Sequence, residues 1–533
     1  MSSMAVRSGL SFPDYAVVAL YALGMIWIGW YFSRRQKNLD EYFVAGRGIN
    51  WLIVGISLFA TLISTISYLT TPGEIIKNGP GILWSALSPF LAFGIIGWLI
   101  IPRIMGKNIM SGYELLDRQF GRGVRSAAAV MFILMRISWI GLIVYTCSIA
   151  LNSMTGWPLP YLLVGMGLVT TLYTVMGGVR AVIITDVVQA VILFGGAALV
   201  VSFAMFEARS LTGWFPDFGN SAITSALNWR PVKLFPDAGP GFLAERITII
   251  TIVVHYVFYY VCICCSDQLL IQRFLTTRDA RAARNSFLTN TLAGLALSIL
   301  LALTGFALLA VFTRNIGLLP PLAELKPEAG AEILAGVPKG DALAAQVYTL
   351  TNAGDKIFHW FIAHLLPAGL SGLLLAALFS AAMSSISSGI NSISTVLMVD
   401  FKGIFGKGLN EAGQVARARL LGVGVGIVAI CVSFLYTFIK GNFMDLAQKS
   451  DRFLVAPMAG VFLMAFFMRR TNRQGAWVQI VLTCVTAFLI TFHEEIFGSY
   501  ISFVWIFPFS LALGLTAGYV VSLLFPPPDG QTA

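Results

Sequence analysis

Charged residues are scarce in this chain. Asp, Glu, Lys and Arg make up 11% of its 533 residues and apolar residues make up 57%, whereas soluble domains carry about 25% charged residues. An apolar stretch of about 20 residues can cross a bilayer, and thirteen windows of the sequence meet this condition. They are approximately 14–33, 49–71, 80–105, 122–151, 158–176, 180–206, 245–268, 285–313, 366–398, 415–438, 444–468, 474–492 and 500–525. The loops between them leave no room for a soluble catalytic domain, so the composition predicts an all-α integral membrane protein with about 13 transmembrane helices.

Histidine is rare as well, and common catalytic signatures are missing. The four histidines are dispersed, and the sequence has neither an HExxH metal motif nor a GxxxxGK[ST] phosphate-binding loop. We therefore expect that the protein is not an enzyme, and that any active transport is driven by an ion gradient. The six cysteines all fall within predicted spans, so no disulfide framework is expected. The cluster at 262–265 can in principle bind a soft metal, but small packing residues are the preferred interpretation.

The net charge of +10 is explained by membrane orientation better than by a nucleic-acid partner. If the first helix runs from outside to inside, the six inward connections hold 4, 5, 1, 4, 4 and 3 Lys or Arg residues, 21 of the 35 in the chain. Basic residues favour the cytoplasmic side of a membrane. We therefore expect a multi-pass protein of the cell (inner or plasma) membrane, with its N-terminus outside and its C-terminus inside.

The order of the spans predicts two structural repeats within a single transmembrane domain, residues 1–533. Five spans in 49–206 and five in 245–468 would have opposite topologies, because five is an odd number. One helix at 14–33 precedes this core, and two helices in 474–525 follow it. Inverted repeats place substrate and ions near the midplane, at the interrupted first helix of each repeat.

A row of hydroxyl residues follows one face of the ninth span. At 100° per residue, this face contains Ser384, Ser387, Ser388, Asn391 and Thr395, with Ser385 beside it. Polar groups inside a membrane are costly and are therefore functional candidates, and hydroxyl oxygens suit alkali cations. Serines also let transmembrane helices pack closely and bond to one another. The row alone does not decide between an ion site and close packing.

Charged residues within the spans are further candidates. Asp186 on the sixth span either neutralises a bound cation or is a structural group near a helix end. Together with the serine row, this carboxylate favours an ion site. The remaining intramembrane charges are Arg136, Asp267, Lys449, Asp451 and Arg452. Either they pair with one another, or one of them faces a cavity and binds an anionic or polar substrate.

Three short motifs stand in order along the chain. The first is Tyr42-Phe43-Val44-Ala45-Gly46-Arg47, which leads into Ser57-Leu58-Phe59-Ala60-Thr61. The second is Tyr173-Thr174, which leads through Gly177-Gly178 to Thr185-Asp186-Val187-Val188-Gln189. The third is Asp267-Gln268, followed by Gln272-Arg273-Phe274-Leu275. Over nearly the whole chain, this order resembles the sodium/solute symporter family, including its bacterial sialic acid and sodium/sugar symporters. The resemblance implies the five-plus-five inverted-repeat fold of the leucine-transporter type.

The resemblance also implies ion sites at matching positions. A first sodium site would use carbonyl oxygens of Ala60, Ile63 and Ala381 with the hydroxyls of Ser384 and Ser385. A second sodium site, found in only some members, would use Asp186 with Ser384, Ser387 and Ser388. Because all these residues are present, the resemblance implies two bound sodium ions.

The substrate-binding residues of known family members are matched less well in this chain. Leu62, Ser64 and Ser67 stand where sialic acid symporters have three hydroxyl residues. Trp139 stands where those proteins have a carboxylate-binding Arg, and Arg136 lies one turn away. Lys449 replaces a Gln of the sodium/galactose transporters, while Tyr260, Ile263 and Gly294 replace their Asn, Tyr and Lys. The candidate substrate-binding residues are Ser64, Ser67, Arg136, Trp139 and Lys449.

These observations predict a sodium-coupled secondary active symporter that imports a small polar organic solute, such as a sugar, sugar acid or carboxylate, by alternating access. Lys449, Arg452 or Arg136 in the cavity would favour an anionic or zwitterionic solute. The expected partners are the solute, sodium and the lipid bilayer, with no nucleic acid. A proton-coupled carrier and a non-transporting sensor on the same scaffold are the alternatives.

Overall fold

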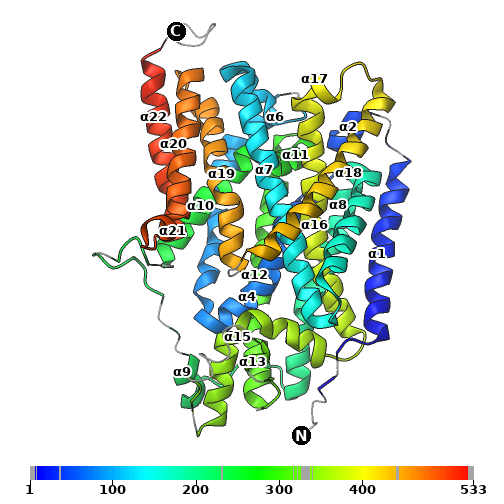
Figure 1. Ribbon diagram of the computed structural model, residues 1–533, viewed down its shortest axis with the longest axis vertical. Coiled ribbons are helices and arrows are strands. Elements are labelled where there is room, and N and C mark those ends of the chain that lie inside the picture. The colour runs from blue at the N-terminus through cyan, green and yellow to red at the C-terminus, as the bar shows by residue number, and fades with distance from the viewer. Residues whose placement is uncertain are drawn as a thin grey trace.

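Helices account for every regular element in the residues that the structure describes. This computed structural model describes residues 6–7, 9–34, 36, 38–107, 109–227, 229, 232–239, 241–245, 247–315, 317–320, 322–325, 336–338, 340–439 and 443–525. Within these ranges, the side chains of 222, 323, 324, 355 and 443–452 lie outside the description. The helices form an elongated bundle in which most run roughly along the long axis, as Figure 1 shows. An all-helical bundle satisfies its backbone hydrogen bonds internally, as crossing a membrane requires.

The first half of the chain contains α1 (Phe12–Ser33), α2 (Leu39–Val44), η1 (Ala45–Arg47), α3 (Trp51–Leu62), α4 (Thr65–Asn78), η2 (Pro80–Leu87), α5 (Ser88–Ile95), the π-turn η3 (Ile96–Ile100), α6 (Ile101–Met105), α7 (Glu114–Thr155), α8 (Leu159–Ala208) and α9 (Ser221–Leu227). The second half contains α10 (Ile249–Ser266), α11 (Gln268–Leu275), α12 (Ala280–Arg314), α13 (Leu322–Leu325), α15 (Ala342–His364), α16 (Leu370–Asp400), α17 (Lys402–Phe405), α18 (Glu411–Leu435), η4 (Tyr436–Phe438), α19 (Phe443–Phe467), α20 (Arg473–Thr491), α21 (His493–Phe497), η5 (Phe503–Trp505) and α22 (Ile506–Leu523).

Ten helical stretches in the described residues are long and apolar enough to cross a membrane, or eleven if the bent pair of 39–47 and 51–62 counts as one span. The difference from thirteen windows arises in three places. α8 contains two windows, α3 and α4 divide the window at 49–71 between them, and only 453–467 of α19 counts as an apolar helix. The protein is therefore a multi-pass, all-helical membrane protein.

α8 changes direction at Gly178. A straight helix of its 50 residues would be about 75 Å long, more than twice the thickness of a bilayer core. Gly178 has φ 58° and ψ −167°, and a Cβ there would lie 2.8 Å from the carbonyl oxygen of Tyr42. A residue with a side chain would be strained in this conformation. Both arms contact α1: a Cβ on Gly29 would lie 2.7 Å from the carbonyl oxygen of Tyr173, and the Gln189 amide donates to the Tyr21 hydroxyl at 3.1 Å.

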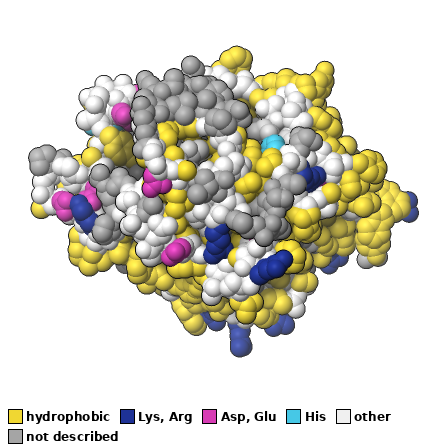
Figure 2. Space-filling view, turned by 90° about the horizontal axis from the view of Figure 1, so that it is seen from below, with side chains coloured by type: hydrophobic (Ala, Val, Ile, Leu, Met, Phe, Trp, Pro, Cys, Tyr) yellow, Lys and Arg dark blue, Asp and Glu magenta, His cyan; other side chains and the backbone are white. Residues whose placement is uncertain are grey.

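The outer surface of the bundle is apolar and its centre is occupied by α16. In the most apolar stretch of α16, 89% of the residues are buried, against 17% in α1. Leu20 of α1 and Val191 of α8 are about 70% exposed, as side chains facing lipid tails would be. At the end of the bundle where α1 begins, hydrophobic side chains reach the perimeter and the few visible charges of both signs are scattered (Figure 2). α1 begins at this end and α22 finishes at the opposite end (Figure 1).

A buried carboxylate attaches the start of α1 to the start of α16. Asp14 is fully buried and accepts hydrogen bonds from the backbone N–H groups of Gly369 (2.7 Å) and Gly372 (3.0 Å). Its other oxygen lies 2.7 Å from Nη2 of Arg7. Arg7 in turn donates to the carbonyl oxygen of Leu366 at 2.7 Å. A carboxylate is stabilised at a helix N-terminus by the exposed N–H groups and the helix dipole, so this contact holds the peripheral helix against the centre.

We expect Asp14→Asn to lower the thermal stability of the purified protein, because it leaves Arg7 without its carboxylate and weakens the contact with the start of α16. The expected loss is about 1–3 kcal/mol, read as a lower Tm in detergent. Asp40→Asn is the matched control, since its carboxylate is partly exposed and lies 3.9 Å from Arg47, and it should change Tm little. Equal Tm values for the two variants would contradict this role of Asp14.

Candidate functional site

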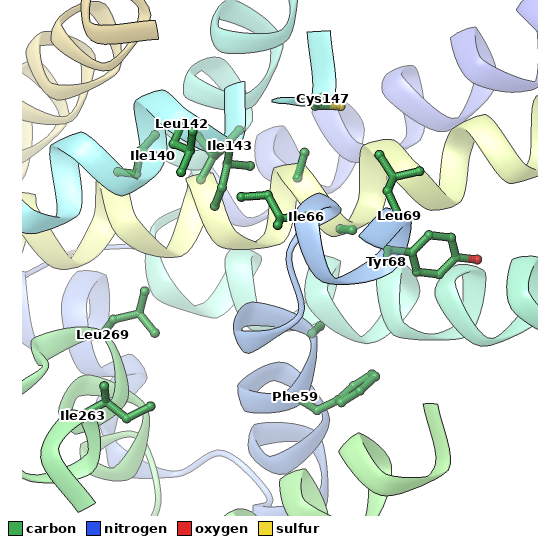
Figure 3. Packing of buried hydrophobic residues seen from close by; sticks show 14 of the residues in the cluster. Phe59, Ile66, Tyr68, Leu69, Ile140, Leu142, Ile143, Cys147, Ile263 and Leu269 are labelled. Carbon is green, nitrogen blue, oxygen red and sulfur yellow. The ribbon is translucent and has the colours of Figure 1, made fainter. Parts of the chain in front are cut away.

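The first part of the site is a break between α3 and α4. Ile63 (ψ 118°) and Ser64 (ψ 167°) have extended backbones, so the last carbonyl groups of α3 lose their helical partners. Ser64 caps the new helix by accepting a bond from the backbone N–H of Ser67 at 3.4 Å. Figure 3 shows this break, with Phe59 on α3 on one side and Ile66 and Tyr68 on α4 on the other. The break leaves backbone oxygens inside the bundle without partners from their own helix.

Two serines of α16 face these oxygens. The Ser384 hydroxyl donates to the carbonyl of Ala60 at 2.8 Å and lies 3.3 Å from that of Ala381. The Ser385 hydroxyl lies 2.9 Å from the carbonyl of Thr61 and 3.4 Å from that of Ile63. The structure thus brings together every group predicted for the first sodium site, and Thr61 adds a carbonyl that sequence reasoning did not include. Oxygen atoms gathered at an unwound helix are suited to a hard cation.

Asp186 lies next to this cluster on the second arm of α8 and is fully buried. Its Oδ2 accepts a short hydrogen bond from Ser57 and a longer one, 3.3 Å, from Thr61. The same oxygen lies 3.0 Å from Nη2 of Arg273. Its Oδ1 is buried and has no hydrogen-bond partner among the described residues. The carboxylate is therefore neutralised by an arginine and keeps one unused oxygen.

The serines predicted for the second sodium site are arranged differently from one another. Ser388 accepts a short hydrogen bond from Arg273 and lies 3.0 Å from the Thr61 hydroxyl. The Ser387 hydroxyl donates instead to the carbonyl of Ser384 at 3.1 Å. Among the described residues, Ser388 is linked to Asp186 through Thr61 and Arg273, and no hydrogen bond joins Ser384 or Ser387 to this carboxylate. The role of this group as an ion site stays a prediction.

Arg273 is the residue that sequence reasoning missed. Because Arg273 precedes a basic segment, the sequence assigns it to an inward connection. The structure instead places it in α11, where its side chain is 1% exposed. The signal was the apolar run Leu269-Leu270-Ile271 before it and Phe274-Leu275 after it, which continues a buried helix through this point. A buried charge needs a partner, and the run therefore indicated that Arg273 pairs inside the bundle.

A second broken helix separates α10 from α11. The break is the single residue Asp267 (φ −85°, ψ 116°), whose carboxylate accepts a bond from the backbone N–H of Leu269 at 2.9 Å. Arg136 of α7 forms a short, buried ion pair with the same carboxylate. Of the two possibilities that the sequence left open for these two charges, the structure shows pairing. Arg136 therefore holds the break and is absent from the walls of the cavity described next.

A cavity of about 270 Å³ lies beside the first break. Three of the predicted substrate residues line it: Ser64, Ser67 and Trp139. Its other polar or aromatic lining residues include Phe59, Thr70, Thr71, Glu74, Ser85, Tyr256, Tyr259, Tyr260, Asn290, Thr291 and Ser298. The side chain of Lys449 lies outside the described residues. A cavity of this size, apolar with several polar groups, is typical of a site for one small solute.

Comparisons with known proteins agree with this arrangement. The family model "Sodium:solute symporter family" matches residues 42–482. The chain is 27% identical to the sodium/sialic acid symporter SiaT of Proteus mirabilis over 491 residues, 91% of this chain and 90% of that protein. It is 26% identical to the sodium/glucose cotransporter of Vibrio parahaemolyticus over 504 residues, 91% of this chain and 86% of that protein.

Solved structures share the fold. A substrate-bound, outward-open Na⁺-coupled sialic acid symporter matches with a TM-score of 0.75 and 24% identity, over 98% of this chain and 100% of that one. A nucleobase-cation-symport-1 family transporter matches with a TM-score of 0.52 and 13% identity, over 91% and 95%. The family match covers most of the chain, and the chain therefore belongs to the sodium:solute symporter family, a family of sodium-coupled transporters and not of enzymes.

Proposed function

We propose that the protein imports a small polar organic solute, a sugar, sugar acid or carboxylate, together with sodium by alternating access. The observation that carries this proposal is the group of oxygens at the α3/α4 break, where Ser384 and Ser385 meet the freed carbonyls of Ala60 and Ile63. In the structure, these hydroxyls donate to the carbonyls. A bound sodium ion would turn both kinds of oxygen towards itself and fix α16 against the broken helix.

Two sodium ions are proposed for each solute. The first would bind carbonyls of Ala60, Ile63 and Ala381 with Ser384 and Ser385. The second would bind Asp186 with Ser384, Ser387 and Ser388, and the unused Oδ1 of Asp186 supports a place for it. Sodium can favour the solute-binding state only by binding it more tightly than the other state. Coupling is reciprocal, so the solute raises sodium affinity by the same factor.

The proposed architecture has 13 spans, with inverted repeats at 49–206 and 245–468, one helix before them and two after. It is supported by the change of direction at Gly178, which divides α8 into two arms, and by the breaks at Ile63 and Asp267. Each break interrupts the first helix of a proposed repeat. An odd number of spans also fits the start of α1 and the end of α22, which lie at opposite ends of the bundle. The basic inward loops support an outside N-terminus.

The solute is proposed to bind in the 270 Å³ cavity, where the hydroxyls of Ser64 and Ser67 and the ring of Trp139 are available. Arg136 would act on the solute through its ion pair with Asp267, which fixes the α10/α11 break. Lys449 remains a proposed contact from α19. Hydroxyl and aromatic groups suit the polar edges and apolar faces of a sugar ring.

We expect Ser384→Ala and Ser385→Ala each to raise the sodium concentration for half-maximal uptake about tenfold or more, because each removes an oxygen that a buried cation needs. The measurement is sodium-dependent uptake into proteoliposomes. Ser392→Ala is the matched control, since its hydroxyl donates to Gly389 of the same helix at 3.0 Å, and it should leave sodium dependence unchanged. Unaltered sodium dependence in both test variants would exclude this ion site.

Solute binding should change the fluorescence of Trp139, one of twelve tryptophans, because the ring lines the cavity. A panel of sugars, sugar acids and carboxylates is added to the purified protein in sodium and then in potassium. We expect a response only in sodium, and we expect Trp139→Phe to remove most of it. Trp98→Phe is the control, since Trp98 is 61% exposed on the outer surface. Equal responses in both salts would favour a proton-coupled carrier or a sensor.

A further inference from the structure

Arg273 places a positive charge at the position where the second sodium ion is proposed to bind. Its Nη2 contacts both Oδ2 of Asp186 and the hydroxyl of Ser388. Its Nε donates to the Ser57 hydroxyl at 3.1 Å, and its Nη1 donates to the carbonyl of Leu269 in its own helix at 3.2 Å. One guanidinium group therefore connects α11 with α3, α8 and α16.

A guanidinium and a sodium ion compete for a single carboxylate in this place. Asp186 supplies one negative charge, and the other groups around it are hydroxyls and backbone. Two cations a few ångströms apart in a buried site repel strongly, because the interior screens charge poorly. Either cation alone neutralises the carboxylate, and both together leave a net positive charge. The two occupants are therefore alternatives.

The ion pair between Arg273 and Asp186 leaves one carboxylate oxygen available to a second cation. Oδ2 of Asp186 takes all three of its hydrogen bonds, while Oδ1 is fully buried with no partner among the described residues. A buried oxygen without a hydrogen bond is costly. An arriving cation can contact this oxygen first, and so approach the carboxylate before the guanidinium has left.

We propose that Arg273 is a tethered cation that competes with the second sodium ion for Asp186. This inference rests on the proposed second ion site. With sodium absent, Arg273 neutralises Asp186 and locks α11 to the three neighbouring helices. When sodium binds, the guanidinium leaves, and α11 loses the bonds through which Arg273 holds it to α3, α8 and α16. Because α11 continues from the broken helix at Asp267, the ion's arrival is linked to movement of the second broken helix. The competition also lowers sodium affinity, which favours release of the ion inside the cell.

The test is Arg273→Gln, measured in the full-length protein in proteoliposomes by sodium titration of solute-dependent uptake. Glutamine keeps hydrogen-bonding groups and removes the charge. We expect the half-saturating sodium concentration to fall at least fivefold, because the competitor is gone. We further expect added guanidinium chloride to compete with sodium in this variant and to have little effect on the wild type, where the site has its own guanidinium. A purely structural arginine would not produce this competition.

Arg125→Gln is the matched control. Arg125 is also an ion-paired arginine, with Asp400 at 2.8 Å and Asp117 at 3.0 Å, but it has no contact with Asp186. It should leave the half-saturating sodium concentration and the response to guanidinium unchanged. If Arg273→Gln does not fold, the double variant Arg273→Gln/Asp186→Asn removes both charges, and we expect it to move one sodium ion fewer per solute than the wild type.

Two results would overturn the inference. The first is a folded Arg273→Gln protein with an unchanged or raised half-saturating sodium concentration and no competition by guanidinium. The second is a wild type that moves one sodium ion per solute and an Arg273→Gln variant that moves two, which would make the arginine a permanent replacement for the ion. A wild type without any sodium dependence would refute the proposed function itself, so the two failures are distinguishable.

Discussion

The structure depends on the need to neutralise a carboxylate in the middle of a membrane protein. Asp186 is fully buried, and an isolated ionised carboxylate in such surroundings is very costly. Three helices supply the groups that stabilise it: Ser57 and Thr61 from α3, Arg273 from α11, and Ser388 from α16 through that arginine. Any change in the cation beside Asp186 therefore changes how α3, α11 and α16 are held together.

The two broken helices are held by polar contacts. The α3/α4 break frees carbonyl groups that Ser384 and Ser385 reach from α16. The α10/α11 break is fixed by Asp267, which both caps α11 and pairs with Arg136. Irregular backbone within a membrane protein is tolerated where protein or a cavity satisfies its polar groups. Both breaks meet this condition, and Arg273 lies two turns beyond the second one. In the proposed mechanism, ion binding and helix movement therefore involve the same residues.

Much of this arrangement could be predicted from the sequence. Helical periodicity placed Ser384, Ser387 and Ser388 on one face, and the resemblance to a known family joined Ser384 and Ser385 to the carbonyls of 60 and 63, which the structure brings within hydrogen-bonding distance. A glycine pair such as Gly177-Gly178 is typical of a turn, and a positive φ occurs at the second glycine. These features are local, or are carried by short motifs, and so they are readable without coordinates.

The remaining features depend on contacts between distant parts of the chain. Arg273 and Asp186 are 87 positions apart, and Arg136 and Asp267 are 131 apart. Hydropathy windows also cannot distinguish one bent helix from two spans, as α8 illustrates.

The most direct test of the account is the membrane voltage at which solute flux through the reconstituted protein reverses. For an uncharged solute, two coupled sodium ions predict that this voltage shifts by about 59 mV for each tenfold change in the sodium ratio and by about 30 mV for each tenfold change in the solute ratio. A reversal voltage that follows the proton gradient and ignores sodium would contradict the account.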